Sequence, residues 1–330
     1  MLNATLPGDT MTLSLCFKVR GLILAAALIS GFGLVTHATA QEGRPYLVDL
    51  NTRTVTDLGL GRGISETYGI NDAGQVVGGF ETAEGTDHAF ITGPDGMGVR
   101  DLGTLGGHES HALDVNDAGQ VVGWSTTGGR PFHAFITGPD GVGMRDLGTL
   151  AGHGGDSSAR GINDVGQVVG WSTTTETPPH AFITGLDGRG MRDLGHLGGG
   201  VSDAYDINDA GQVVGWSTTG EGERDSHAFI TGPDGMEMRD LGTLGGEVSF
   251  AHGINDAGQV VGSSETGIGS TTHAFITGPD GMEMRDLGTL GGGFSFAYDI
   301  NDAGRVVGLS DTFEGGSQAF ITGPDGMGWA

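Results

Sequence analysis

One pattern of apolar and polar residues recurs along most of the chain. The stretch QVVGWS at 120–125 places two valines side by side, so an extended segment there would bury both of its faces. Three further stretches of the same unit have the length of strands, at 110–116, 133–137 and 144–147. The breaks between them carry the turn-forming phrases NDAG and GPDG. Each unit therefore predicts four short strands joined by tight turns.

The unit occurs six times at a nearly constant period. Its NDxG phrase begins at asparagines that are 45 to 47 residues apart, namely Asn71, Asn116, Asn163, Asn208, Asn255 and Asn301. Self-similarity at such a period indicates a repeat architecture, and sheets that bury both faces are typical of the blades of a propeller. The sequence therefore predicts an all-β protein. Residues 41–330 would form one domain, a β-propeller of about six four-stranded blades.

The two ends of the repeat region suggest how the ring would close. The last unit stops at GPDGMGWA, before a fourth strand, and TVTDLG at 54–59 resembles the strand that this unit lacks. We expect the N-terminal strand to close the propeller by pairing with the last unit. PYLVDL at 45–50 resembles an additional third strand, so a partial seventh blade is one alternative. An open β-solenoid is another, although it would need capping units at both ends.

The first forty residues have the organisation of a secretory signal peptide. Lys18 and Arg20 precede an apolar run at 21–35, and the small residues Ala-Thr-Ala lead to a cleavage site between Ala40 and Gln41. The run is shorter than the roughly 20 apolar residues that span a bilayer. We therefore expect residues 1–40 to be removed and the protein to be secreted, to the periplasm or outside the cell.

Composition narrows the classes of partner. The only cysteine, Cys16, lies in the predicted signal peptide, so the mature chain would contain no disulfide. The formal net charge of the whole chain is −26, and cleavage would remove two basic residues and one acidic residue. Such a surface repels nucleic acid and anionic membranes. We expect a monomer that binds a protein or a glycan.

The repeated phrases resemble those of a known family. HAFITG, RDLGTLGG and INDAGQVVGWS are similar to the HAF-type extracellular repeat of exported bacterial proteins, and the likeness covers about all of 46–330. The resemblance implies secretion and a repeat architecture, with no established biochemical activity. The chain departs from the pattern at Gln318, which replaces the histidine, and at Gly79, Ser263 and Leu309, where three units have tryptophan.

Strand direction assigns the turns to two faces. The NDAG and GPDG turns would share one face, which we call face X, and they are nearly identical in every unit. The connections between the second and third strands would lie on the opposite face, face Y, and they differ in every unit. Binding residues are often carried by variable loops on a rigid scaffold. We therefore expect a partner to meet face Y.

The histidine that opens the third strand is interpreted as structural. Antiparallel pairing would bring His133 close to Asp146, so that a hydrogen bond satisfies both groups. A catalytic residue is normally needed once, whereas this position recurs in every unit as His88, His133, His180, His227, His273 and Gln318. Glutamine can form a hydrogen bond but cannot act as a base.

Three tryptophans occupy equivalent positions near face Y. Trp124, Trp171 and Trp216 could stack on the sugar rings of a ligand, as in a lectin-like propeller. Packing between neighbouring blades is the interpretation that we favour, because aromatic side chains mostly bury area.

The predicted function is a binding or surface-interaction scaffold of unknown biochemical activity. An alternative is a hydrolase or lyase that acts on extracellular polysaccharide in the central channel. Such an enzyme would use side chains that are not repeated, and the candidates are His108, Glu109, His111, His153, Asp156 and His196. A structural product of repeat expansion is a third possibility. No metal or cofactor is expected, because neither acidic turn supplies a run of ligands.

Overall fold

The chain is described by a computed structural model. The description covers residues 2–6, 9–13, 23–24, 46–49, 54–57, 64–129, 131–152, 154–175, 178–220, 225–267, 269 and 271–328. The predicted cleavage site at Ala40 and Gln41 and the candidate residue His153 lie outside these ranges. In the described part of the chain, no helix is long and apolar enough to cross a membrane.

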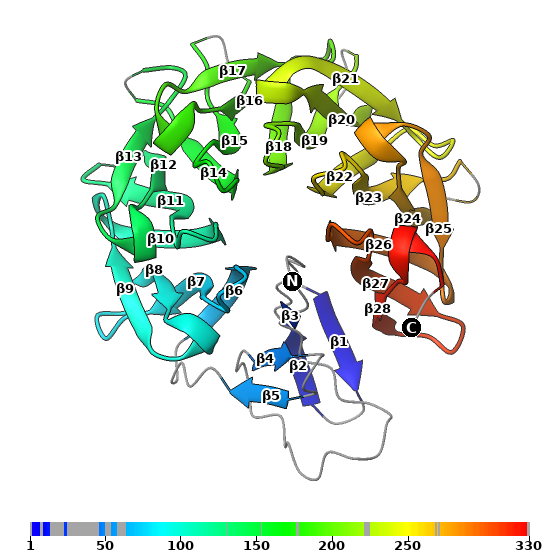
Figure 1. Cartoon of the computed structure of the whole chain (residues 1–330), viewed down its shortest axis with the longest axis horizontal. Helices are drawn as coiled ribbons and strands as arrows, with labels where there is room; N and C mark the ends of the chain where they lie inside the picture. Colours follow the sequence, from blue (N-terminus) through cyan, green and yellow to red (C-terminus); the bar gives the residue numbers. More distant parts are fainter. Residues whose placement is uncertain are drawn as a thin grey trace.

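Antiparallel sheets follow one another around a central axis, each with its first strand innermost and its last strand outermost (Figure 1). The first sheet contains β6 (Ile64–Ile70), β7 (Val76–Glu81), β8 (Asp87–Thr92) and β9 (Val99–Gly103). The second contains β10 (Gly106–Val115), β11 (Val121–Thr127), β12 (Phe132–Ile136) and β13 (Arg145–Gly148). The third contains β14 (Ser157–Ile162), β15 (Val168–Ser172), β16 (His180–Ile183) and β17 (Arg192–Gly195).

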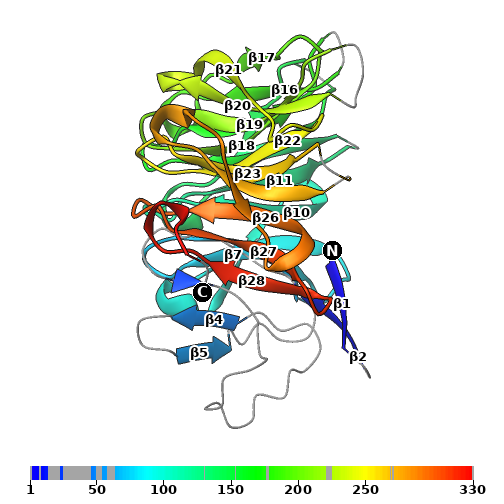
Figure 2. The same ribbon diagram turned by 90° about the vertical axis from the view of Figure 1, so that its right-hand side faces the viewer.

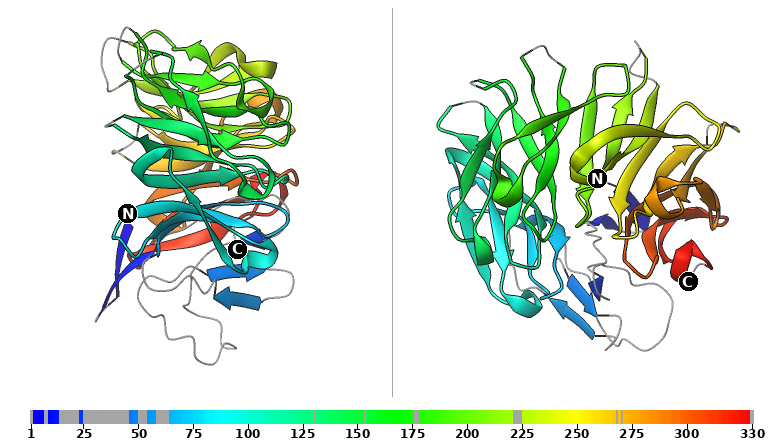
Figure 3. Two further views of the ribbon diagram at one scale, coloured as in Figure 1. Left: turned by 90° about the vertical axis from the view of Figure 1, so that its left-hand side faces the viewer. Right: turned by 45° about the horizontal axis from the view of Figure 1, so that its top comes forward.

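The later units repeat this order, and side views show the sheets succeeding one another in chain order (Figures 2 and 3). The fourth sheet contains β18 (Ser202–Ile207), β19 (Val213–Thr218), β20 (Ser226–Gly232) and β21 (Met236–Gly242). The fifth contains β22 (Ser249–Ile254), β23 (Val260–Glu265), β24 (Thr272–Ile276) and β25 (Arg285–Gly288). The sixth contains β26 (Gly291–Ile300), β27 (Val306–Thr312) and β28 (Ser317–Ile321). Short 3₁₀ turns lie at Pro94–Gly96, Pro139–Gly141, Leu186–Gly188, Pro233–Gly235, Pro279–Gly281 and Pro324–Gly326.

The N-terminal strands do not show the closure that we predicted. β5 (Thr54–Asp57) pairs with β4 (Tyr46–Asp49), which also pairs with β3 (Ile23–Leu24), whereas β28 pairs only with β27 among the described residues. β1 (Leu2–Leu6) and β2 (Asp9–Leu13) form a separate pair. A hairpin between neighbouring strands costs less loop-closure entropy than a contact with the far end of the chain. In Figure 1 the β4–β5 pair lies between the first and the last sheet.

The apolar core fills the spaces between successive sheets. Val121 packs in the cluster shared by the first and second sheets, and Val122 packs in the cluster shared by the second and third. Both valines are fully buried. The prediction that the second strand buries both of its faces is therefore confirmed.

Each second strand needs a glycine where it crosses a bulge in the innermost strand. The β10–β11 register shifts between Ala112 and Asp114, and a Cβ atom added to Gly123 would lie 1.9 Å from the carbonyl oxygen of His111. The same clash, at 1.9 to 2.1 Å, would occur in the other units at Gly78, Gly170, Gly215, Gly262 and Gly308.

The turns of face X are tied together by hydrogen bonds. Within the second unit, the amide of Gly141 in the GPDG turn donates to the carbonyl of Gly119 in the NDAG turn, at 2.8 Å. Between units, the side-chain amide of Asn71 donates to the carbonyl of Asn116, at 2.9 Å. The same link joins each later unit to the next, as far as Asn301. Face X is therefore a rigid surface built from repeated polar turns.

Neighbouring sheets alternate at one position of the innermost strand. The residue two places before the asparagine is glycine in the odd-numbered sheets and aspartate in the even-numbered ones: Gly69, Asp114, Gly161, Asp206, Gly253 and Asp299. Asp114 accepts a hydrogen bond from the amide of Ile162 in the third sheet, at 3.0 Å. Asp206 accepts the equivalent bond from Ile254 in the fifth. These hydrogen bonds therefore join the second sheet to the third and the fourth sheet to the fifth.

Candidate functional site

The histidines that open the third strands form hydrogen bonds with aspartates of the fourth strands. Nδ1 of His133 lies 2.8 Å from Oδ2 of Asp146, which is the contact predicted from the sequence. Oδ1 of Asp146 also accepts the amide of Gly148, so the carboxylate holds the end of the fourth strand. The equivalent pairs are His88–Asp101, His180–Asp193, His227–Asp240 and His273–Asp286. Gln318, on β28, is exposed.

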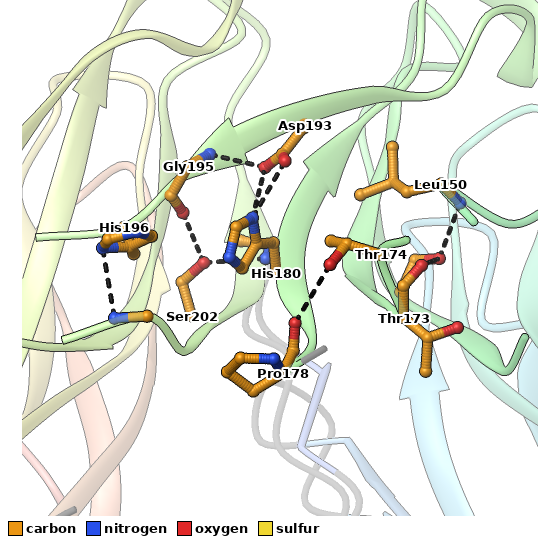
Figure 4. A network of polar contacts seen from close by, with 12 residues as sticks. Leu150, Thr173, Thr174, Pro178, His180, Asp193, Gly195, His196 and Ser202 are labelled. Carbon is orange, nitrogen blue, oxygen red and sulfur yellow. Dashed lines mark hydrogen bonds and ion pairs between the residues drawn. The ribbon is translucent and has the colours of Figure 1, made fainter. Parts of the chain in front are cut away.

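We expect the His180→Gln variant to lose about 1 kcal/mol of unfolding free energy, the worth of one hydrogen bond. Figure 4 shows His180 bonded to Asp193, which also accepts the amide of Gly195. Glutamine stands at this position in the sixth unit and can keep part of the bond. Urea unfolding of both proteins measures the change. Unchanged stability together with a lost binding activity would contradict the structural interpretation.

The three tryptophans contact aromatic side chains of their own or of neighbouring sheets. Trp124 stacks on His111, with ring centres 4.6 Å apart, and Phe132 contacts both Trp124 and Trp171. Nε1 of Trp216 donates to the hydroxyl of Tyr205, at 3.1 Å. Of these contacts, only the one between Phe132 and Trp171 joins two sheets, and the others lie within one sheet. All three tryptophans are half-buried.

Candidate residues that are not repeated lie near the connections between one sheet and the next, which we call the crossings. Hydrogen bonds to neighbouring strands hold them in place. The amides of His108 and Glu109 both donate to Oγ1 of Thr126, at 2.9 Å. Oδ1 of Asp156 accepts the amide of Phe132, at 3.1 Å.

The remaining described histidines of this set also have local contacts. Nδ1 of His196 accepts the amide of Gly198, at 2.9 Å. Burial lowers the pKa of His111, although Asp87, Glu66 and Glu109 oppose this effect. Their local contacts suit ordering of the crossings better than a shared catalytic cluster.

A second set of variable side chains lies on the innermost strands, around the central axis of the sheets. Two positions of the S-x-A-x motif change chemical type from unit to unit within an otherwise repeated strand. The first position holds Glu66, His111, Ser158, Asp203, Phe250 and Phe296, and the second holds Tyr68, Leu113, Arg160, Tyr205, His252 and Tyr298. Of these residues, we singled out only His111 from the sequence, although the variability of both positions was visible there.

Side chains of the second position form a stack that runs across four sheets. Arg160 pairs with Asp203 through two contacts, Nε to Oδ1 at 3.0 Å and Nη2 to Oδ2 at 2.8 Å. The guanidinium carbon lies 5.0 Å from the centre of the Tyr205 ring. The other neighbour of Tyr205 in the stack is His252, at 5.6 Å and nearly parallel, and Tyr298 follows at 6.2 Å. We call Arg160, Asp203, Tyr205, His252 and Tyr298 the channel cluster.

Burial changes the acidity of most members of the channel cluster. Asp203 is only 7% exposed, and burial raises its pKa to about 6, although Arg160 opposes the shift. Burial also lowers the pKa of His252 to about 4 and raises the pKa values of Tyr205 and Tyr298. At neutral pH the cluster therefore contains one ion pair, a neutral imidazole and two neutral phenols. Several displaced pKa values in one place are typical of functional sites.

The channel cluster offers hydrogen-bonding groups and aromatic surface. No group of three or more histidine, cysteine, aspartate or glutamate side chains that could hold a metal ion is found among the residues that the structure describes. The guanidinium of Arg160 and the rings of Tyr205, His252 and Tyr298 are groups that can bind an organic ligand.

Comparison with known proteins identifies the fold. No protein-family model and no curated protein matches the sequence. Among solved structures, the β-propeller domain of the Trilobed protease from Pyrococcus furiosus, described as having an open velcro topology, is 13% identical with a TM-score of 0.62, covering 94% of this chain and 95% of that one.

Two further similar structures belong to enzymes. A prolyl endopeptidase structure is 11% identical with a TM-score of 0.66 and covers 97% of this chain, which spans 49% of the endopeptidase. An oligogalacturonate lyase in complex with manganese is 12% identical with a TM-score of 0.54, covering 78% of this chain and 73% of that one. These likenesses show that the chain has a β-propeller fold built from antiparallel sheets.

Proposed function

We propose that the protein is an exported β-propeller scaffold that binds a protein or glycan partner at face Y and the adjoining channel. The observation that carries this proposal is the placement of variable residues. Side chains that change from unit to unit lie in the face Y connections and on the innermost strands, whereas the turns of face X are nearly identical. A scaffold with one constant face and one varied face separates stability from recognition.

The polar groups of face X are already engaged. The side chain of Asn163 donates to both Gln167 and the carbonyl of Asn208, and its oxygen accepts the amide of Gln167. The neighbouring Asp164 amide donates to Asp209. Groups that bond to one another in every unit have little capacity left for a specific ligand.

Face Y carries exposed side chains that are not repeated. Phe313, in the connection between β27 and β28, is 88% exposed, and a pocket of about 160 Å³ beside this connection is lined by Phe294, Phe296 and Leu309. Exposed apolar groups beside a pocket are common at binding surfaces. The predicted signal peptide and the HAF-type resemblance support export, and the strong acidity supports a partner other than nucleic acid or an anionic membrane.

We also propose that the β4–β5 pair fills the gap between the first and last sheets as a partial seventh blade. Its position in Figure 1 supports this. A ring closed by residues 54–59 beside β28, and a ring that stays open, are the alternatives. Proximity labelling between the β4–β5 pair and β28 distinguishes a filled gap from a ring that stays open.

A polysaccharide hydrolase or lyase is the second candidate. The observation that favours it is the channel cluster, where Asp203, Tyr205 and His252 have displaced pKa values. Product release from neutral and acidic polysaccharides, abolished by Asp203→Asn, would establish turnover. Binding without product release supports the scaffold.

A steric block on each face tests the scaffold proposal. The exported chain is expected to contain no cysteine, so Phe313→Cys on face Y and Met282→Cys on face X can each be coupled to a polyethylene glycol chain. Both native side chains are exposed, at 88% and 57%. We expect the face Y conjugate to lose most binding to glycan arrays and cell-wall preparations, and the face X conjugate to keep it. The reverse result would contradict the proposal.

A further inference from the structure

We infer that the channel cluster binds the uncharged sugar ring of a neutral glycan, with Arg160 as the principal hydrogen-bond donor. The inference rests on the proposed function, because it identifies the ligand of the same channel. Three features of the described side chains carry it: the free edge of the Arg160 guanidinium, the zero net charge of its ion pair, and the aromatic character of the following sheets.

Arg160 is held in place with part of its donor set unused. A guanidinium presents five N–H groups in a fixed plane. Asp203 takes one from Nε and one from Nη2, and Tyr205 supports the plane from one side. Arg160 keeps 36% of its side chain exposed. Donors on Nη1 and Nη2 therefore remain for a ligand, and Asp203 and Tyr205 hold them in one orientation before the ligand arrives.

The charge balance of the site favours a neutral ligand. Arg160 and Asp203 together carry no net charge at neutral pH, because the carboxylate is ionised above a pKa of about 6. The chain as a whole carries a net charge of −26. A polyanionic ligand such as a uronate chain is therefore repelled once it comes within about 8 Å of the acidic surface, the range over which charges act at physiological salt. Hydroxyl groups can accept hydrogen bonds from Arg160 without this penalty.

The sheets that follow supply an apolar surface. Phe250 of the fifth sheet contacts Trp216 of the fourth, with ring centres 5.8 Å apart, and Phe296 and Tyr298 lie on the sixth. All four side chains are half-buried. The surface formed by these sheets is therefore polar at Arg160 and Asp203 and aromatic at the fifth and sixth sheets. A sugar ring has the matching distribution, because its hydroxyl groups project from a ring with apolar C–H faces.

Titration calorimetry with defined oligosaccharides tests the inference. The probes are cellohexaose, mannohexaose and chitohexaose, with hexagalacturonate as the anionic counterpart. We expect at least one neutral probe to bind, and hexagalacturonate to bind at least about tenfold more weakly. Arg160→Lys keeps the charge but loses the planar donor set, and it should weaken neutral binding at least about tenfold. His252→Phe keeps the stack without a ring nitrogen and should weaken binding to a smaller extent.

The matched control is Arg189→Lys. Arg189 belongs to the same unit as Arg160 but is exposed after a GPDG-type turn of face X, so this change should leave affinity unaltered. Thermal melting of each variant establishes that it is folded. The inference is overturned if no neutral probe binds, if hexagalacturonate binds more tightly, or if folded Arg160→Lys binds as the parent does. If the face Y conjugate still loses binding to a partner in any of these cases, the scaffold proposal stands and only the assignment of a sugar ligand fails.

Discussion

Replacing Gly215 by alanine is expected to destabilise the protein by at least about 4 kcal/mol, in the range reached by few single substitutions. The new Cβ atom would lie 2.0 Å from the carbonyl oxygen of Asp203 and 2.9 Å from the Cα of Ala204. Both are backbone atoms, so a side-chain rotation cannot relieve the contact. Gly215 pairs with Ala204 on one side and Phe229 on the other, and moving its strand would disturb both ladders.

Urea unfolding compares this variant with a matched glycine substitution. Gly293 lies in β26, and a Cβ atom there would meet only a methyl group of Thr271, at 4.0 Å. Gly293→Ala should therefore change stability by less than about 1 kcal/mol. Equal stability of the two variants would show that the bulge of the innermost strand can move away from the second strand.

The channel cluster is expected to contain two opposing pH dependences of stability. Asp203 has a pKa of about 6 when folded, against 3.8 as its ordinary value, so the folded state binds more protons between those limits. Its contribution to the unfolding free energy is therefore larger at pH 4 than at pH 7, by about 2 kcal/mol at roughly 1.4 kcal/mol per pKa unit, because the unfolded carboxyl is itself partly protonated at pH 4. His252 has a pKa of about 4 when folded, below its ordinary 6.5, and its contribution falls as the pH drops through this range.

Single substitutions should separate the two effects. Relative to the parent protein, Asp203→Asn should lose stability between pH 7 and pH 4, because only the histidine contribution remains. His252→Phe should gain stability over the same interval. Urea unfolding at several pH values measures both slopes, and all other carboxylates contribute equally to each protein. Curves that run parallel to that of the parent would contradict the burial of Asp203 and His252.

The repeat allowed the fold to be predicted from the sequence. Two adjacent valines at 121 and 122 predicted burial on both faces of a strand, and the structure places them in two different cores. The hydrogen bond between His133 and Asp146 also followed from the strand order. These features depend on the spacing of residues within one repeat unit, which can be counted in the sequence.

Other features depend on contacts that local spacing does not determine. We expected residues 54–59 to pair with the last unit because their sequence resembles a fourth strand. Among the described residues, β5 pairs with its neighbour β4 instead. The contact between Arg160 and Asp203 joins two units across a strand bulge, so the number of residues between them gave no indication of it. The signal in the sequence lies at the two positions of the innermost strand whose chemistry changes from unit to unit while the rest of the strand stays constant.

The alternation of glycine and aspartate near the end of the innermost strands bears on how such a chain could have grown. A Cβ atom at Gly161 would lie 3.2 Å from the Cα of Asp206, a tight contact that the glycine avoids, and Asp206 in turn bonds to Ile254 of the sheet beyond. The structural module is then a pair of units rather than one. Copying a single unit would set two carboxylates or two glycines against each other, so viable descendants should differ from this chain by even numbers of repeats.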